Sequence, residues 1–220
     1  MDAVIFDMDG VLIDSEPLHF EVDIMVLQKL NINEGKSYLE RFVGYTNPAM
    51  WEIIKKEYSI KNTIEELIEL QIITKLKYLE ESNYTAIEGI KELLEELQKN
   101  KIPIGIASSS PRIFIEAVIN KINIVKYFDN WISGEEVRKS KPEPDIFIKM
   151  AELLKVNPEK CIVIEDSKSG TVAAKRAGMK CIGYKNINSG NQDLSKADRV
   201  VETLLEINLE NMKELFHDND

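Results

Sequence analysis

The stretch VIFDMDGVLIDSEPLHF, residues 4–20, begins as an apolar strand and then places two carboxylates where the strand ends. Asp7 and Asp9 lie two positions apart, and Gly10 directly after them indicates a turn. Ligands of parallel sheets bind at the carboxyl ends of the strands, so we expect both carboxylates at the mouth of a site. Taken alone, Asp-Gly is also a common turn pair in which an aspartate only caps a loop.

Further β-rich runs recur along the chain, and the later ones alternate with helical patterns. The predicted strands are residues 3–6, 103–107, 131–133, 161–164 and 180–184. Apolar periodicity predicts helices over residues 88–98, 111–122 (with Ser110 as its N-cap), 144–154 and 169–177. This alternation predicts an α/β fold, a doubly wound, Rossmann-like parallel sheet with helices on both faces.

One block interrupts the alternation. Within residues 16–82 every periodic segment is helical, and Thr63 with Glu66 forms a capping-box pattern. We interpret the block as a small all-helical cap domain inserted after the first strand. The predicted domains are therefore residues 1–15 and 83–220 for the core and 16–82 for the cap.

Composition restricts the classes of partner. The 220 residues include 28 basic and 38 acidic side chains, a formal net charge of -10, which disfavours nucleic acid and anionic membrane surfaces as partners. The two cysteines and two histidines do not indicate a zinc site. The cysteines, Cys161 and Cys181, each begin an apolar stretch, which is typical of buried free thiols in a reducing compartment. We found no signal peptide pattern and no membrane-span pattern, and we expect a cytoplasmic monomer.

Polar groups follow two other predicted strands as well. Ser108 and Ser109 follow residues 103–107, while Glu165 and Asp166 follow residues 161–164. Four acids gathered with Asp7 and Asp9 in one crevice would repel one another and stay ionised only beside a cation. Oxygen ligands without histidine or thiolate favour Mg²⁺.

Four motifs in order resemble those of the haloacid dehalogenase-like superfamily. They are DMDGV at residues 7–11, Ser108 after an apolar strand, KPEP at 141–144 and EDSKSG at 165–170. The match spans nearly the whole chain. The position of the helical block resembles the phosphatase and β-phosphoglucomutase branch, whose cap lies between the first and second motifs.

The resemblance implies a role for each motif residue. Asp7 would be the nucleophile that forms an aspartyl-phosphate, and Asp9 the general acid and base. Ser108, Ser109 and Lys141 would bind the phosphate. The residues Asp7, Asp9, Asp166 and Glu165 would form the Mg²⁺ site, with Glu165 either a direct ligand or a neighbour of the ligands.

The cap bears on which reaction is catalysed. Residues 14–19, which include Ser15 and His19, resemble sugar-phosphate and hexitol-phosphate hydrolases as well as β-phosphoglucomutase. The mutases carry basic residues in a cap loop that matches residues 42–47 here, where Val43 and Asn47 are neutral. Ser15, His19 and Asn47 are therefore candidate cap or substrate residues.

These observations lead to a hydrolase of small phosphorylated metabolites, such as sugar or polyol phosphates, as the expected function. A β-phosphoglucomutase-type isomerase that uses Arg41 or another basic residue of the cap for the distant phosphate is the alternative. A binding protein without turnover is a third class, which the intact motif residues disfavour.

Overall fold

The computed structural model describes residues 1–42 and 45–216. Its contacts divide the chain into two compact units. One unit combines Met1–Asp14 with the chain from Tyr84 onward, and the other consists of Ser15–Asn83. Each unit has its own helices and its own buried apolar side chains.

The larger unit is built on a six-stranded sheet in the order β3-β2-β1-β4-β5-β6. All pairings between its strands are parallel. The strands are β1 (Ala3–Phe6), β2 (Ile104–Ser108), β3 (Asn130–Ser133), β4 (Cys161–Glu165), β5 (Lys180–Tyr184) and β6 (Arg199–Val201). The predicted doubly wound α/β fold is confirmed, and the short edge strand β6 is an addition to it.

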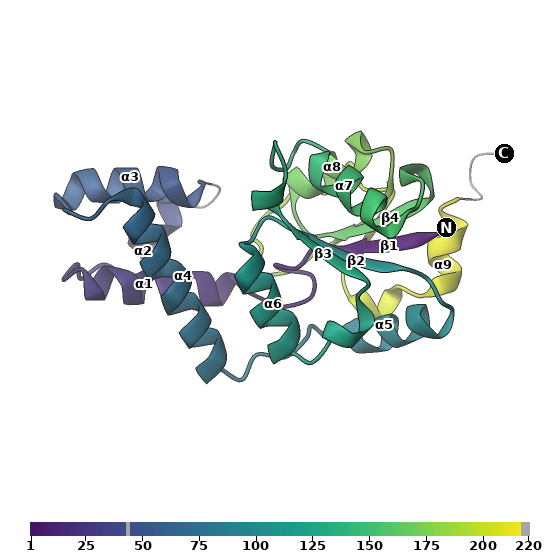
Figure 1. The fold of residues 1–220 in the computed structure, drawn as a ribbon, viewed down its shortest axis with the longest axis horizontal. Helices are drawn as coiled ribbons and strands as arrows, with labels where there is room; N and C mark the ends of the chain where they lie inside the picture. Colours follow the sequence, from purple (N-terminus) through teal and green to yellow (C-terminus); the bar gives the residue numbers. More distant parts are fainter. Residues whose placement is uncertain (43–44, 217–220) are drawn as a thin grey trace. The chain divides into compact units, whose positions relative to one another are not determined.

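Helices cover both faces of this sheet, as Figure 1 shows. Helices α7 (Asp145–Leu154) and α8 (Lys168–Arg176) lie on one face, where they bury Ala3, Ile5 and Val163. The opposite face carries α5 (Ile90–Lys99), α6 (Arg112–Lys121) and α9 (Leu209–Glu214). Because both faces are covered, every residue of β1, β2 and β4 is buried, and these strands are apolar apart from Ser108 and Glu165 at the ends of β2 and β4.

The four predicted helix starts of the larger unit differ from the observed ones by one or two residues, and the differences at α6 and α8 bear on the site. Helix α6 begins at Arg112 with Pro111 in an extended conformation at its N-cap, so the prediction of Ser110 as N-cap was wrong. Helix α8 begins at Lys168, and the hydroxyl of Ser167 accepts a hydrogen bond from the backbone N–H of Gly170 at 3.0 Å. Ser169 therefore lies inside the first turn rather than at the cap.

The smaller unit is entirely helical. It contains α1 (Glu16–Lys29), α2 (Lys36–Leu39), α3 (Asn47–Tyr58) and α4 (Ile64–Glu81). Fully buried apolar side chains from three of these helices form its core, namely Leu18, Trp51, Ile54 and Leu67. Within the described residues, no helix is long and apolar enough to cross a membrane.

Both cysteines lie inside the sheet as free, buried thiols. Cys161 opens β4 and Cys181 lies in β5. Burial raises the pKa of the Cys161 thiol to about 12 and also raises that of Cys181. Both groups are therefore protonated at neutral pH.

The capping box at the start of α4 provides a test of local stability. The Thr63 hydroxyl accepts from the N–H of Glu66 at 3.2 Å, and Glu66 accepts from the N–H of Thr63 at 3.0 Å. We expect Thr63→Ala to lower the free energy of unfolding by about 1 kcal/mol because an N–H at the helix start loses its acceptor. Thr63→Ser retains a hydroxyl and should restore most of that loss in urea denaturation, whereas equal losses in both variants would contradict the capping role.

Candidate active site

Asp7 directly follows β1, a central strand of the sheet, and therefore lies at the carboxyl ends of the strands. The Asp7 backbone N–H donates to the carbonyl of Ile164 in β4 at 2.9 Å, which continues the strand pairing up to this residue. The chain then turns sharply, because the N–H of Gly10 donates to the carbonyl of Ile13 at 2.8 Å and Gly10 has a φ of +78°. Asp7 is only 6% exposed, so its carboxylate lies in a nearly dry environment.

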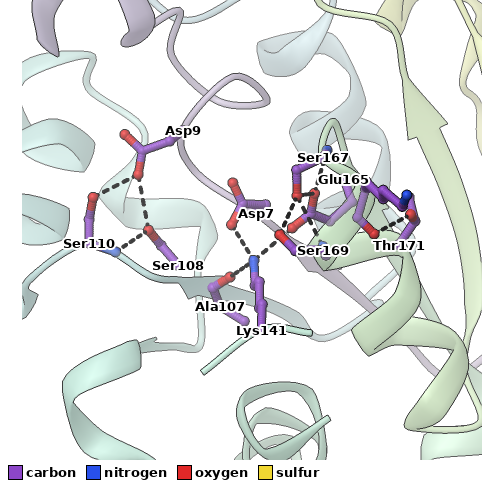
Figure 2. A network of polar contacts seen from close by, with 12 residues as sticks. Asp7, Asp9, Ala107, Ser108, Ser110, Lys141, Glu165, Ser167, Ser169 and Thr171 are labelled. Carbon is purple, nitrogen blue, oxygen red and sulfur yellow. Dashed lines mark hydrogen bonds and ion pairs between the residues drawn. The ribbon is translucent and has the colours of Figure 1, made fainter. Parts of the chain in front are cut away.

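Lys141 connects the ends of three strands, as Figure 2 shows. Its Nζ donates to Asp7 Oδ1 at 2.5 Å, to the Ala107 carbonyl of β2 at 3.1 Å and to Glu165 Oε1 at 2.7 Å. Burial alone would lower the pKa of this lysine, but Asp7 and Glu165 overcome that effect and hold the pKa above its usual value. The ammonium is therefore a permanent positive charge at the sheet edge.

Glu165 is fixed on both of its oxygens. Oε1 binds Lys141, while Oε2 accepts from the N–H and the hydroxyl of Ser167, both at 2.8 Å. A Cβ on Gly170 would lie 1.6 Å from Oε1, so glycine leaves the space in which this carboxylate lies. Glu165 thus holds Lys141 in place and has no oxygen without a hydrogen bond.

Asp9 lies apart from the lysine and contacts the loop after β2 (Figure 2). Its Oδ2 accepts from the hydroxyl of Ser108 at 3.2 Å and from that of Ser110 at 2.7 Å. The Ser110 N–H donates to the Ser108 hydroxyl oxygen at 3.0 Å, which fixes the two serines relative to each other. Both serine side chains are buried.

Excess negative charge surrounds the single lysine. Burial raises the pKa of Asp7 well above its usual value, and Glu165, Asp166 and Asp9 raise it further against the opposing effect of Lys141. Burial and the charge of Glu165 raise the pKa of Asp166 to about 7. The site therefore has carboxylates whose charge the protein itself does not fully compensate.

Asp7 and Asp166 each have one carboxylate oxygen that the described residues leave without a hydrogen bond. Neither Asp7 Oδ2 nor Asp166 Oδ1 receives a hydrogen bond from the residues that the structure describes. Over residues 1–42 and 45–216, no three histidine, cysteine, aspartate or glutamate side chains form a ready-made metal cluster. Two oxygen ligands in an excess of negative charge nevertheless suit a hard cation that completes its shell with backbone oxygens, water or substrate.

The predicted site residues fall into three groups. The structure brings together Asp7, Asp9, Ser108, Lys141, Glu165 and Asp166 around the ends of β1, β2 and β4. Ser109 lies in the same loop with an exposed side chain. The cap candidates Ser15, His19 and Asn47 belong to the other unit, where Ser15 is buried and Asn47 is exposed at the start of α3.

The structure describes the surroundings of His19 but not the whole of the predicted cap loop. His19 lies close enough to Asp23 to act on its pKa, which burial raises and Gln71 and His19 lower. Val43 and Gly44 of the predicted cap loop lie outside the described residues.

Sequence reasoning did not assign to the site two residues that contact its acids, Ser110 and Ser189. Ser110 was assigned to a helix cap, although it donates to Asp9, and Ser189 in the loop after β5 donates to Asp166 Oδ2. The run of three serines at 108–110 after a strand was a usable signal for Ser110. Ser189 lies 23 residues from Asp166, and nothing in its neighbourhood marks it.

The raised pKa of Asp166 predicts how stability depends on pH. Without a cation, folded Asp166 keeps its proton between about pH 4 and 7 while the unfolded chain loses it, so stability falls as pH rises through this window. In EDTA, Asp166→Asn should therefore show a smaller loss of unfolding free energy between pH 5 and pH 8 than the unmodified chain, measured by urea denaturation. The exposed Asp193, whose pKa Ser195 lowers, serves as control, because Asp193→Asn should leave the profile over this range unchanged. Identical profiles for Asp166→Asn and the unmodified chain would contradict the prediction.

Comparison with known proteins places this geometry in a family. A family model described as haloacid dehalogenase-like hydrolase matches residues 4–184. A phosphorylated carbohydrates phosphatase from Thermotoga maritima is 33% identical over 220 residues, which cover 94% of this chain and 100% of that protein. Hexitol phosphatase B from Escherichia coli is 29% identical over 181 residues, 82% of each chain.

A solved structure gives the same result. The crystal structure of a putative beta-phosphoglucomutase from Thermotoga maritima superimposes with a TM-score of 0.80 at 32% identity, covering 97% of this chain and 99% of that one. The family match, from residue 4 in β1 to residue 184 at the end of β5, includes the ends of β1, β2 and β4 and the lysine that connects them. The chain belongs to the haloacid dehalogenase-like hydrolase family.

Proposed function

We propose that the protein is a Mg²⁺-dependent phosphomonoester hydrolase that acts on small phosphorylated metabolites through an aspartyl-phosphate. The observation that carries the proposal is the state of Asp7. Its Oδ1 is held by Lys141, and its Oδ2 accepts no hydrogen bond from the described part of the chain. A carboxylate fixed through one oxygen leaves the other in place for attack on phosphorus.

In this proposal, Asp7 Oδ2 attacks the phosphorus and the substrate alcohol leaves. Asp9 gives a proton to that alcohol and later takes one from the water that hydrolyses the acyl phosphate. Asp9 is engaged with Ser108 and Ser110 in the structure, so it must exchange these partners to act. An arriving phosphate competes for the same hydroxyls, which couples substrate binding to the release of Asp9.

The phosphate would be bound by groups at the ends of β2 and of the segment before α7. In this proposal the Ser108 hydroxyl and the backbone N–H of Ser109 would donate to phosphate oxygens. Lys141, which is paired with Asp7, would supply the positive charge. Positive charge here stabilises the negative charge that spreads over the phosphoryl oxygens during transfer.

Magnesium is the cation that these ligands fit. Asp7 and Asp166 would hold it with side-chain oxygens, and the backbone carbonyl of Asp9 would complete the protein's share. When bound, it would neutralise charge on the transferring phosphoryl group. Both oxygens of Glu165 are already used, so we assign Glu165 to positioning Lys141 rather than to direct ligation.

The relatives support sugar or polyol phosphates as substrates. The names of the Thermotoga maritima and Escherichia coli relatives specify phosphorylated carbohydrates and hexitol. A net charge of -10 disfavours large polyanionic substrates, whereas a small phosphate ester needs only the local charge of Lys141.

A β-phosphoglucomutase-type isomerase remains the alternative, because the Thermotoga maritima structure carries that description. A mutase needs a positive charge in the cap for the second phosphate, and Arg41 was the candidate. Its guanidinium donates to Glu57 and to the Tyr38 hydroxyl, and it stacks over the rings of Tyr38 and Phe42 at 4.3 and 4.5 Å. A charge already paired in this way favours the hydrolase.

Asp7→Asn tests the catalytic assignment. The amide has no nucleophilic anion, so we expect release of inorganic phosphate from any phosphomonoester to fall at least about a thousandfold. Asp2→Asn, an exposed change outside the site, should leave turnover unchanged. Full activity of Asp7→Asn would overturn the assignment.

A substrate panel tests the class and the cofactor together. Phosphate release from sugar phosphates, polyol phosphates, nucleotides and glycolytic esters should be highest for the first two groups. EDTA should abolish it and added Mg²⁺ should restore it. Turnover that is insensitive to EDTA would exclude the cation from the mechanism.

The isomerase alternative is separated by its product. With β-glucose 1-phosphate and a bisphosphate primer, we expect glucose and inorganic phosphate, detected by chromatography and a phosphate assay. Accumulation of glucose 6-phosphate without phosphate release would favour the mutase.

A further inference from the structure

The loop of residues 185–192, which follows β5, is bonded to the catalytic turn although no motif predicted it. Its sequence, KNINSGNQ, is polar except for Ile187. The amide or hydroxyl groups of three of its side chains donate hydrogen bonds to residues of the segment 10–14 or to Asp166. These three hydrogen bonds attach a largely exposed loop to the turn after Asp9 and to Asp166.

Asn186 anchors the loop to the turn after Asp9. This residue is 6% exposed, and its Nδ2 donates to the Gly10 carbonyl at 2.9 Å. Its Oδ1 accepts from the N–H of Asn188 at 2.8 Å, and its carbonyl accepts from the N–H of Ser189 at 3.2 Å. One buried amide therefore fixes both the catalytic turn and the backbone that carries Ser189.

Ser189 contacts the acid directly. Its hydroxyl donates to Asp166 Oδ2. A Cβ on Gly10 would lie 2.0 Å from that same oxygen and 2.9 Å from the Ser189 hydroxyl oxygen, so the pair packs directly on the glycine backbone. With Oδ2 engaged by the hydroxyl, the carboxylate cannot rotate freely, and Oδ1 is the oxygen left for a ligand.

The far end of the loop is tied to the helix that follows Asp166. Gln192 Nε2 donates to the Ser189 carbonyl at 2.9 Å, and its Oε1 accepts from the N–H of Lys168 at 3.1 Å. Ser189 is thus held from both sides, by Asn186 and by Gln192. Ser189 is consequently linked through Gln192 to the start of α8, the helix that follows Asp166.

We propose that Ser189 is a positioning residue for the cation site, which orients the Asp166 carboxylate so that Oδ1 faces the bound Mg²⁺. This inference rests on the proposed function, because it assigns Asp166 as a ligand. Mutation of a group that orients a metal ligand through a hydrogen bond typically lowers metal affinity by about 10–100-fold. Loss of the hydroxyl should therefore weaken cation binding without altering the contacts of the substrate.

Mg²⁺ binding to the full chain tests the inference. The EDTA-treated and dialysed protein is titrated with MgCl₂ alone by calorimetry, for the unmodified chain and for Ser189→Ala, Ser189→Thr and Ser195→Ala. We expect Ser189→Ala to weaken Mg²⁺ binding at least about tenfold. Ser189→Thr keeps the hydroxyl and should keep the affinity, and Ser195→Ala changes an exposed serine outside the loop and should do the same.

Kinetics provide the second measurement. With p-nitrophenyl phosphate, the Mg²⁺ concentration for half-maximal activity of Ser189→Ala should rise by the same factor, while KM at saturating Mg²⁺ stays unchanged. Equal Mg²⁺ affinity of Ser189→Ala and the unmodified chain, or an equal loss in Ser189→Thr, would overturn the role of Ser189 alone. If the unmodified chain neither bound Mg²⁺ nor hydrolysed the ester, the proposed function would fall, and this inference with it.

Discussion

The buried ammonium of Lys141 is the interaction on which the rest of the site depends. It is the common donor to groups at the ends of β1, β2 and β4, which belong to segments far apart in the sequence. A buried charge of this kind is tolerated only when it is paired and hydrogen bonded, and removal of one partner typically costs about 3–5 kcal/mol. The lysine and its two carboxylates therefore form a unit in which each member requires the others. The same unit engages Oδ1 of Asp7 and leaves Oδ2 without a hydrogen bond from the described residues.

The negative charge around this unit exceeds the positive charge of Lys141. One lysine faces several carboxylates, and the raised pKa values of Asp7 and Asp166 reflect the burial and repulsion that result. A protein that only needed a stable core would avoid such a cost. In the proposed function, this deficit of positive charge would allow a cation and a phosphate ester to bind in the same place.

Much of the fold and part of the site could be predicted from the sequence. The strands were recognisable because β1, β2 and β4 are buried on both faces and are therefore largely apolar up to their last residues. The acids were recognisable because they lie at or within three residues of the ends of β1 and β4. β6 was missed because it has only three residues, and Ser110 was misassigned because the following proline imitates a helix start. Ser189 could not be found, since its contact with Asp166 depends on how a loop folds back over Gly10.

The two thiols described in the sheet have a practical consequence. Cys161 and Cys181 lie in the neighbouring strands β4 and β5 and are buried. Burial raises the pKa of both thiols, so both stay protonated at neutral pH. Alkylating reagents attack thiolates, so neither sulfur reacts while β4 and β5 remain paired. The rate of alkylation therefore measures how often β4 and β5 separate. Because β4 ends at Glu165 and is followed by Asp166, this rate also measures local unfolding next to the candidate site.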